Sequence, residues 1–122
     1  MNIMQDQVME FYRKMGKEPS ETLQTELIRE ECYELLGAVR DRDTVDILDG
    51  ICDLLYVTLG LANALGVDIE PFFNEVHKTN LAKIGPKGPK FRSDGKLLKP
   101  VNWIPPDLQR ILKEQEQIHG PN

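Results

Sequence analysis

Residues 27–36 read LIREECYELL, and residues 46–56 read DILDGICDLLY. Both stretches place apolar residues at the three- and four-residue intervals of an amphipathic helix. Acidic residues interrupt the apolar face: Glu31 lies four residues after Leu27 and four before Leu35. The pattern predicts two helices that carry carboxylates on the faces by which they pack.

The acids of each stretch share one helical face. They are Glu30, Glu31 and Glu34 in the first stretch, and Asp46, Asp49 and Asp53 in the second. Only a short polar turn, residues 41–43, separates the two predicted helices. A turn of this length makes the helices antiparallel neighbours. We therefore expect Glu31 and Glu34 to lie opposite Asp49 and Asp53.

Crowded carboxylates need compensation. Like charges one turn apart destabilise an isolated helix by roughly 0.2–0.5 kcal/mol per pair, and burial increases the cost. Oxygen ligands without histidine or thiolate partners favour Mg²⁺, with Mn²⁺ as a substitute. The alternative is that the acids are solvated, or paired with Arg29, Arg40 and Arg42.

The charge of the chain is unevenly distributed. The 122 residues carry a net charge of −5, which argues against binding to nucleic acid or to an anionic membrane. Residues 83–99 nevertheless contain six basic residues and one acid, Asp94. An acidic body with one basic segment suggests an anionic ligand held between metal-laden acids and lysines.

The sequence gives no sign of export or of a membrane span. The first residues lack the basic start and apolar run of a signal peptide, and no window approaches the ~18 apolar residues of a membrane helix. Cys32 and Cys52 lie in apolar helical runs without a partner cysteine nearby, so neither zinc nor a disulfide is expected. We expect a cytoplasmic protein.

Helical periodicity and capping residues predict an all-α fold in one domain, residues 1–122. The expected elements are an antiparallel bundle of four core helices, a loop and a last helix. Their ranges are 3–15, about 20–40, about 44–65 and about 69–82, then the loop 84–103 and the helix 106–117. The run Leu54–Leu65 is apolar on most sides, and a chain of this size hardly surrounds such a helix. Homo-oligomerisation, as a dimer or a dimer of dimers, is therefore expected to complete the bundle.

The basic segment is rich in glycine and proline, as expected for a loop. Its lysines on a glycine-rich backbone could reach phosphate oxygens. The candidates are Lys83 at the end of the fourth helix, then Lys87, Lys90 and Arg92. The alternative is a solvated basic loop without a ligand.

Three motifs in this order resemble a known superfamily. They are Glu30-Glu31-x-x-Glu34, then Asp49-x-x-x-Asp53-Leu-Leu-Tyr-Val, then Asn80-x-x-Lys83. The chain resembles the MazG-like all-α nucleoside triphosphate pyrophosphohydrolases, which include the dimeric dUTPases and phosphoribosyl-ATP pyrophosphohydrolase. The resemblance covers about residues 3–106. It implies Mg²⁺-dependent hydrolysis of a nucleoside triphosphate to the monophosphate and pyrophosphate.

The resemblance also implies roles for individual residues. Glu31 and Glu34 match metal ligands, Asp53 matches the acid that closes the second motif, and Glu30 or Glu34 is the expected general base. Asn80 and Lys83 match positions that contact the nucleotide or its phosphates, and Lys83 would offset charge on the leaving pyrophosphate.

One position departs from the family pattern. The superfamily's usual spacing puts an acid at position 50, where this chain has Gly50. Asp49 is the expected substitute ligand, and Asp46 is the less favoured one.

The motifs are compatible with more than one substrate. We expect a deoxynucleotide, with dGTP and dUTP both possible. The first alternative is phosphoribosyl-ATP hydrolysis. The second is a non-catalytic helical interaction module whose acids are surface charge.

Overall fold

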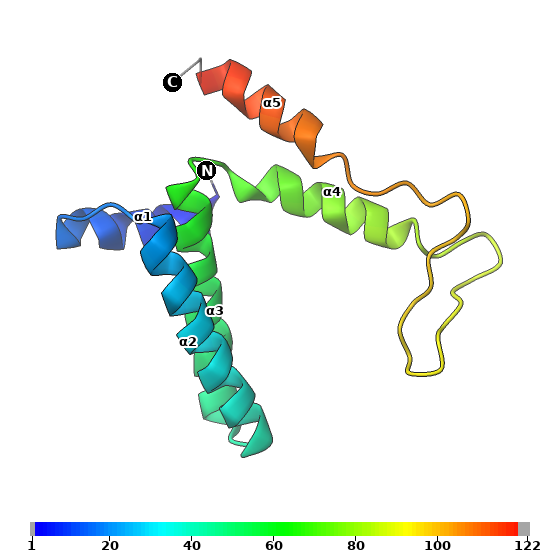
Figure 1. Ribbon diagram of the computed structural model, residues 1–122, viewed down its shortest axis with the longest axis horizontal. Helices are drawn as coiled ribbons and strands as arrows, with labels where there is room; N and C mark the ends of the chain where they lie inside the picture. Colours follow the sequence, from blue (N-terminus) through cyan, green and yellow to red (C-terminus); the bar gives the residue numbers. More distant parts are fainter. Residues whose placement is uncertain (1, 120–122) are drawn as a thin grey trace. The chain divides into compact units, whose positions relative to one another are not determined.

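A computed structural model describes residues 2–119, with side chains up to residue 117. The described chain forms five α-helices: α1 (Ile3–Met15), α2 (Glu21–Arg40), α3 (Thr44–Ala64), α4 (Ile69–Leu81) and α5 (Leu108–His119). Figure 1 shows them in chain order. Between residues 2 and 119 no strand forms, only two isolated β-bridges in the loop after α4. The predicted all-α fold is confirmed.

Local chemistry explains where the helices begin and end. The side chains of Asn2, Ser20 and Asp43 each accept a hydrogen bond from a backbone N–H in the first turn of the following helix. Gly16 and Gly66 follow α1 and α3 with φ angles of 72° and 73°, a left-handed conformation that glycine adopts without a steric penalty. The predicted boundaries of the first three helices are therefore confirmed within about one residue.

Helices α2 and α3 form an antiparallel pair joined by residues 41–43 (Figure 1). The helices approach each other closely at Gly50, which is buried. A Cβ atom at this position would lie 3.2 Å from Cα of Leu35. A larger residue would push the helices apart, so the absence of a side chain at position 50 permits their contact.

Buried amides join α1 to the pair. The Gln5 side chain donates to Asn63 Oδ1 over 3.0 Å, and Asn63 donates back to the Gln5 carbonyl over 3.1 Å. The Tyr12 hydroxyl bonds to Gln24 Oε1, and Gln24 Nε2 donates to the Val57 carbonyl over 2.9 Å. These bonds satisfy polar groups that would be costly to bury alone, and they fix the packing of α1.

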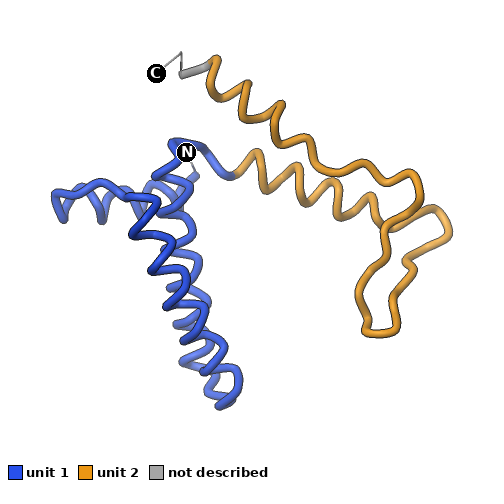
Figure 2. Tube along the Cα trace, viewed as in Figure 1, with its two compact units in different colours: residues 1–69 blue, residues 70–122 orange. Residues whose placement is uncertain are grey.

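The chain consists of two compact units, residues 1–69 and 70–122 (Figure 2). Helices α1 to α3 belong to the first unit. The second contains α4, the loop after it and α5. The loop includes a short hairpin closed by a bridge between Phe91 and Leu97. The single domain expected over residues 1–122 remains a prediction.

Helix α5 begins at Leu108, two residues after the predicted start. Pro105 and Pro106 precede it, and the residue before a proline is disfavoured in helical conformation. Asp107 is the better start because its Oδ1 accepts from the Arg110 N–H over 3.2 Å. Its own N–H donates to Glu75 of α4 over 2.8 Å. That bond ties the start of α5 to α4 within the second unit.

Within the described residues, no single helix has both the length and the apolar character needed to cross a membrane. Only α3 and α4 taken together, across the bend between them, meet those two criteria.

Candidate active site

The acids of α2 differ in their surroundings. Glu30 and Glu34 are exposed, whereas Glu31 is half-buried. The Oε2 atom of Glu31 is buried and has no hydrogen-bond partner. A buried carboxylate oxygen is normally hydrogen-bonded or bound to a cation, so this atom is a candidate cation ligand.

Neighbouring carboxylates act on Glu31. Burial raises its pKa above the usual value, and the negative charges of Glu34 and Asp53, a side-chain hydrogen bond with Glu34 and the charge of Glu30 raise it further. Asp53 belongs to α3, so the acids of the two helices are close enough to repel one another. The helix pair therefore brings Glu31, Glu34 and Asp53 together, as their spacing predicts.

The acids of α3 border a cleft of about 370 Å³ in the first unit. Both helices line it, through Glu34, Gly37, Ala38, Asp41, Asp46, Asp49, Gly50 and Asp53. Asp53 is half-buried, and Asp46 and Asp49 are exposed. The cleft is open and rich in carboxylates, which suits a hydrated cation.

The structure explains the missing acid at position 50. This position faces Leu35 at the contact between the helices, where any Cβ would be crowded by backbone and side chain. An aspartate there would require Leu35 to shift by a few tenths of an ångström. Asp46 and Asp49 both border the cleft instead, so either could supply the replacement carboxylate.

Salt bridges do not neutralise these acids. Arg29 pairs with Glu26 over 3.7 Å, and Arg40 pairs with Asp41 over 3.4 Å. Across residues 2–117, the six ion pairs leave out every one of Glu30, Glu31, Glu34, Asp46, Asp49 and Asp53. The alternative of pairing with Arg29, Arg40 and Arg42 therefore finds no support, whereas the exposure of Glu30, Glu34, Asp46 and Asp49 leaves these four acids solvated.

The donor set fits a hard divalent cation. Carboxylate oxygens are the ligands that Mg²⁺ prefers in proteins, and the unpartnered oxygen of Glu31 is one of them. In the side-chain conformations of the described residues, no three His, Cys, Asp or Glu groups converge tightly enough to form a ready-made metal site. Carboxylate rotation would be needed to complete one.

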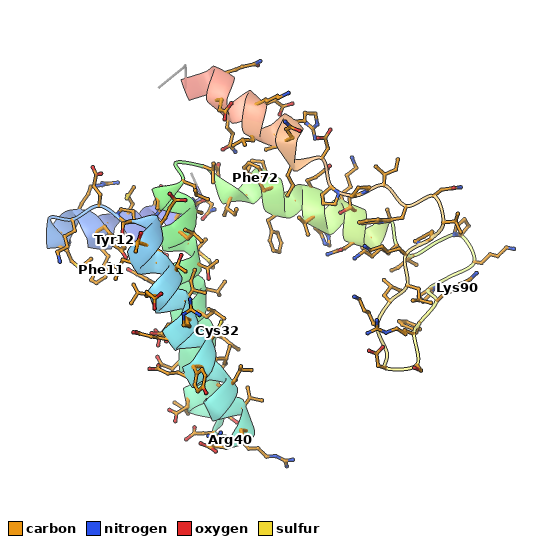
Figure 3. All side chains as sticks on the ribbon, in the orientation of Figure 1. Phe11, Tyr12, Cys32, Arg40, Phe72 and Lys90 are labelled. Carbon is orange, nitrogen blue, oxygen red and sulfur yellow. The ribbon has the colours of Figure 1, made fainter. Side chains whose placement is uncertain are left out.

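The other predicted site residues belong to the second unit. Asn80 is exposed in the last turn of α4, and Lys83 follows that helix, half-buried. Lys87 and Lys90 are exposed on the loop, and Figure 3 shows Lys90 extending from it.

Arg92 is already engaged by a neighbouring carboxylate. Its Nε donates to Asp94 over 2.8 Å, and a second, shorter bond joins the same two side chains. The pair raises the pKa of Arg92 and lowers the pKa of Asp94. Arg92 would have to exchange this partner to bind phosphate.

Sequence reasoning did not single out Lys99. Its Nζ lies 4.9 Å from the centre of the Trp103 ring, and Lys83 Nζ lies 5.2 Å from the same centre. In the sequence a single tryptophan follows several lysines, and this pattern suggests a lysine–tryptophan contact. Only the structure shows which lysines contact the ring.

Comparison with known proteins identifies the family. Residues 1–80, which include the acids and Asn80, match the model of the phosphoribosyl-ATP pyrophosphohydrolase family (PRA-PH). An uncharacterised protein of Acanthamoeba polyphaga mimivirus is 36% identical over 84 residues, which are 66% of this chain and 31% of that protein. The chain thus spans about a third of this relative's length. Because the family model covers more than half of the chain, the chain belongs to the phosphoribosyl-ATP pyrophosphohydrolase family, within the MazG-like group that its acidic motifs resemble.

Proposed function

We propose that this protein is a Mg²⁺-dependent pyrophosphohydrolase that cleaves a nucleoside triphosphate to the monophosphate and pyrophosphate. The observation that carries the proposal is the buried, unpartnered oxygen of Glu31 among carboxylates from two helices. Rigid helices hold these charges together without a basic partner, and a divalent cation would relieve the repulsion. Family membership supports the same class of reaction.

Each acid has a proposed role. Glu31, Glu34 and Asp53 hold the cation, with Asp49 or Asp46 as a further ligand. When bound, Mg²⁺ neutralises phosphate charge and makes a water molecule more acidic. Glu30 or Glu34 orients that water and takes its proton as it attacks, and the anhydride bond between the α and β phosphates breaks. Mn²⁺ should substitute for Mg²⁺.

Basic residues of the second unit are proposed to bind the phosphates. Lys83 stabilises the negative charge that develops on the leaving pyrophosphate. Asn80 contacts the nucleotide, and Lys87, Lys90 and Arg92 assist with its phosphates. Four of these residues, from Lys83 onward, lie beyond the region matched by the family model, so their proposed roles rest on their charge and their place in the second unit.

The proposed reaction has two candidate classes of substrate. A deoxynucleotide remains the first choice, with dGTP and dUTP as candidates. Phosphoribosyl-ATP is the second, because the matching family model describes that activity. Cleavage at the same α–β anhydride would release pyrophosphate from either, so a single assay compares them.

The test is pyrophosphate release from the four ribonucleotides, the four deoxynucleotides, dUTP and phosphoribosyl-ATP, with Mg²⁺, with Mn²⁺ and with chelator. We expect release that depends on the metal and favours a deoxynucleotide. Greatest release from phosphoribosyl-ATP would establish the second substrate instead. No release from any of them would contradict an enzymatic role and favour the helical interaction module.

Assembly forms part of the proposal. Large apolar side chains on α2 and α3 are exposed, including Tyr33 at 83%, Val45 at 74% and Leu36 at 69%. Leu55 and Leu65 of the apolar α3 run are also exposed. Apolar surface of this kind favours an obligate interface, and we propose a homodimer or a dimer of dimers, with neither nucleic acid nor membrane as partner. Sedimentation that shows a folded monomer at micromolar concentration would contradict it.

A further inference from the structure

Trp103 is fixed to the end of α4. Its indole Nε1 donates to the Thr79 carbonyl over 2.7 Å, and Thr79 is buried. The Trp103 backbone N–H also closes a turn on the Pro100 carbonyl over 3.1 Å. The only tryptophan of the chain is thus held in a defined orientation within the second unit.

Two ammonium groups approach this ring. Lys83 comes from the end of α4 and Lys99 from the far end of the loop, with Nζ atoms 5.2 Å and 4.9 Å from the ring centre. Both distances lie in the range of cation–π attraction. Because both atoms lie near one centre, the two ammonium groups cannot be further apart than the sum of those distances.

Neither ammonium group has an anionic partner. In the described part of the chain, Lys83 and Lys99 form no ion pair, whereas the nearby Arg92 is bound to Asp94. Two cations near one ring repel each other, and the ring's negative face offsets this only in part. A ligand with several linked anionic oxygens would compensate both charges at once.

We propose that Lys99 binds polyphosphate together with Lys83, and that Trp103 is a positioning residue that holds both lysines for this purpose. The ligand class is a linear chain of phosphates, as found in a nucleoside triphosphate or in pyrophosphate. That the physiological ligand is the triphosphate of a nucleotide rests on the proposed function.

The anchored lysines differ from the other basic residues of the loop. Lys87, Lys90 and Lys99 are all exposed, but only Lys99 lies against the Trp103 ring, so Lys87 and Lys90 lose more rotamer freedom when they bind a ligand. Lys99 should therefore contribute more to phosphate binding than Lys90 does, although the two belong to the same basic segment.

The test is calorimetric titration of the full chain with inorganic triphosphate, without divalent metal. Lys99→Gln and Lys83→Gln should each weaken binding by about tenfold, as expected when one hydrogen-bonded charge is lost. Lys96→Gln is the matched control, because it removes one charge from the same loop and should change affinity by less than about twofold. Wild-type affinity in Lys99→Gln, or no binding by the wild type, would overturn the proposal.

Replacing Trp103 tests positioning. Trp103→Leu should weaken binding, and Trp103→Phe should restore part of the loss because it keeps an aromatic face. In the Trp103→Leu variant, adding Lys99→Gln should reduce the affinity for triphosphate much less than it does in the wild type. Independent, additive losses would overturn the positioning role. If circular dichroism shows that Trp103→Leu does not fold, the same double-mutant comparison is made with Trp103→Phe. There too, Lys99→Gln should reduce the affinity for triphosphate less than it does in the wild type.

The titration is independent of turnover. Binding that depends on Lys83 and Lys99 without pyrophosphate release from any nucleotide would contradict the proposed function alone. Normal pyrophosphate release with a Lys99→Gln variant that binds triphosphate like the wild type would contradict this inference alone.

Discussion

Concentrated charge has different surroundings in the two units. In the first, Glu31, Glu34 and Asp53 are crowded on two packed helices without a basic partner. In the second, Arg92 is bound to Asp94, and Lys83 and Lys99 lie against Trp103. The acids lie on helices whose packing fixes the positions of their backbones, whereas a loop can arrange its charges around local partners. Uncompensated charge on a rigid scaffold is therefore the stronger indication of a missing ligand.

The largest expected effect tests the acidic cleft. Glu34→Gln should reduce metal-dependent pyrophosphate release by about 10²–10³-fold, because it removes a charge from a preorganised electrostatic site. Glu26→Gln is the control, since Glu26 lies on the same helix and pairs only with the exposed Arg29. Steady-state rates at saturating Mg²⁺ provide the measurement. Full metal-dependent activity in Glu34→Gln would show that the ligand assignment is wrong.

The next effect tests the basic unit. Lys83→Ala should reduce triphosphate turnover by about 10²-fold, the usual loss for one electrostatic donor. Single alanine variants of Lys87, Lys90 and Arg92 should lose less, because exposed charges are screened and substitute for one another. Equal losses of turnover in all four variants would show that Lys83 contributes no more than Lys87, Lys90 or Arg92.

Nucleotide binding should also order the loop. Trypsin cleavage after Lys87, Lys90 and Arg92 should slow when a non-hydrolysable triphosphate and Mg²⁺ are present, because cleavage requires a locally open chain. Mg²⁺ alone serves as the control and should leave the cleavage rate unchanged. Equal cleavage with and without nucleotide would mean that the loop is not part of the phosphate site.

A smaller effect concerns metal and stability. Saturating Mg²⁺ or Mn²⁺ should raise the melting temperature by about 5–10 °C, because a ligand that binds only the native state stabilises it. Addition of chelator should reverse the shift, and Glu34→Gln should abolish it. A metal-induced shift that survives in Glu34→Gln would place the cation elsewhere.

The smallest effect concerns the pH dependence of the metal-free protein. Because the pKa of Glu31 is raised in the folded state, the penalty on folding is absent below the unfolded value of about 4.3, grows as the pH rises above it, and is complete above the folded pKa. Glu31→Gln should therefore raise the melting temperature at pH 7, and the difference from the wild type should disappear near pH 4. A destabilised variant at pH 7 would mean that the Glu31 carboxylate has a favourable partner.

Much of the helical framework could be predicted from sequence. Ser20, Asp43 and Gly16 are local signals, and each acts on the helix next to it. The short turn at residues 41–43 then made α2 and α3 antiparallel neighbours. That topology was sufficient to bring Asp53 close enough to raise the pKa of Glu31.

Contacts between distant segments could not be predicted. Gln5 and Gln24 are polar residues of a kind usually found at the surface, and only their partners Asn63 and Tyr12 explain their burial. In the sequence Lys99 is one of several equivalent lysines, and only the structure shows its contact with the Trp103 ring. Such contacts depend on tertiary packing, which hydrophobic periodicity does not encode.

The contact between Gly50 and Leu35 has a consequence for the choice of ion. A Cβ atom at position 50 would lie 3.2 Å from the Leu35 Cα atom, so the backbones of the two helices approach each other closely beside the cleft that the acids line. Cavity size and ligand flexibility decide between small and large divalent ions. Selectivity by ionic radius would then depend on a residue that has no side chain and touches no ion.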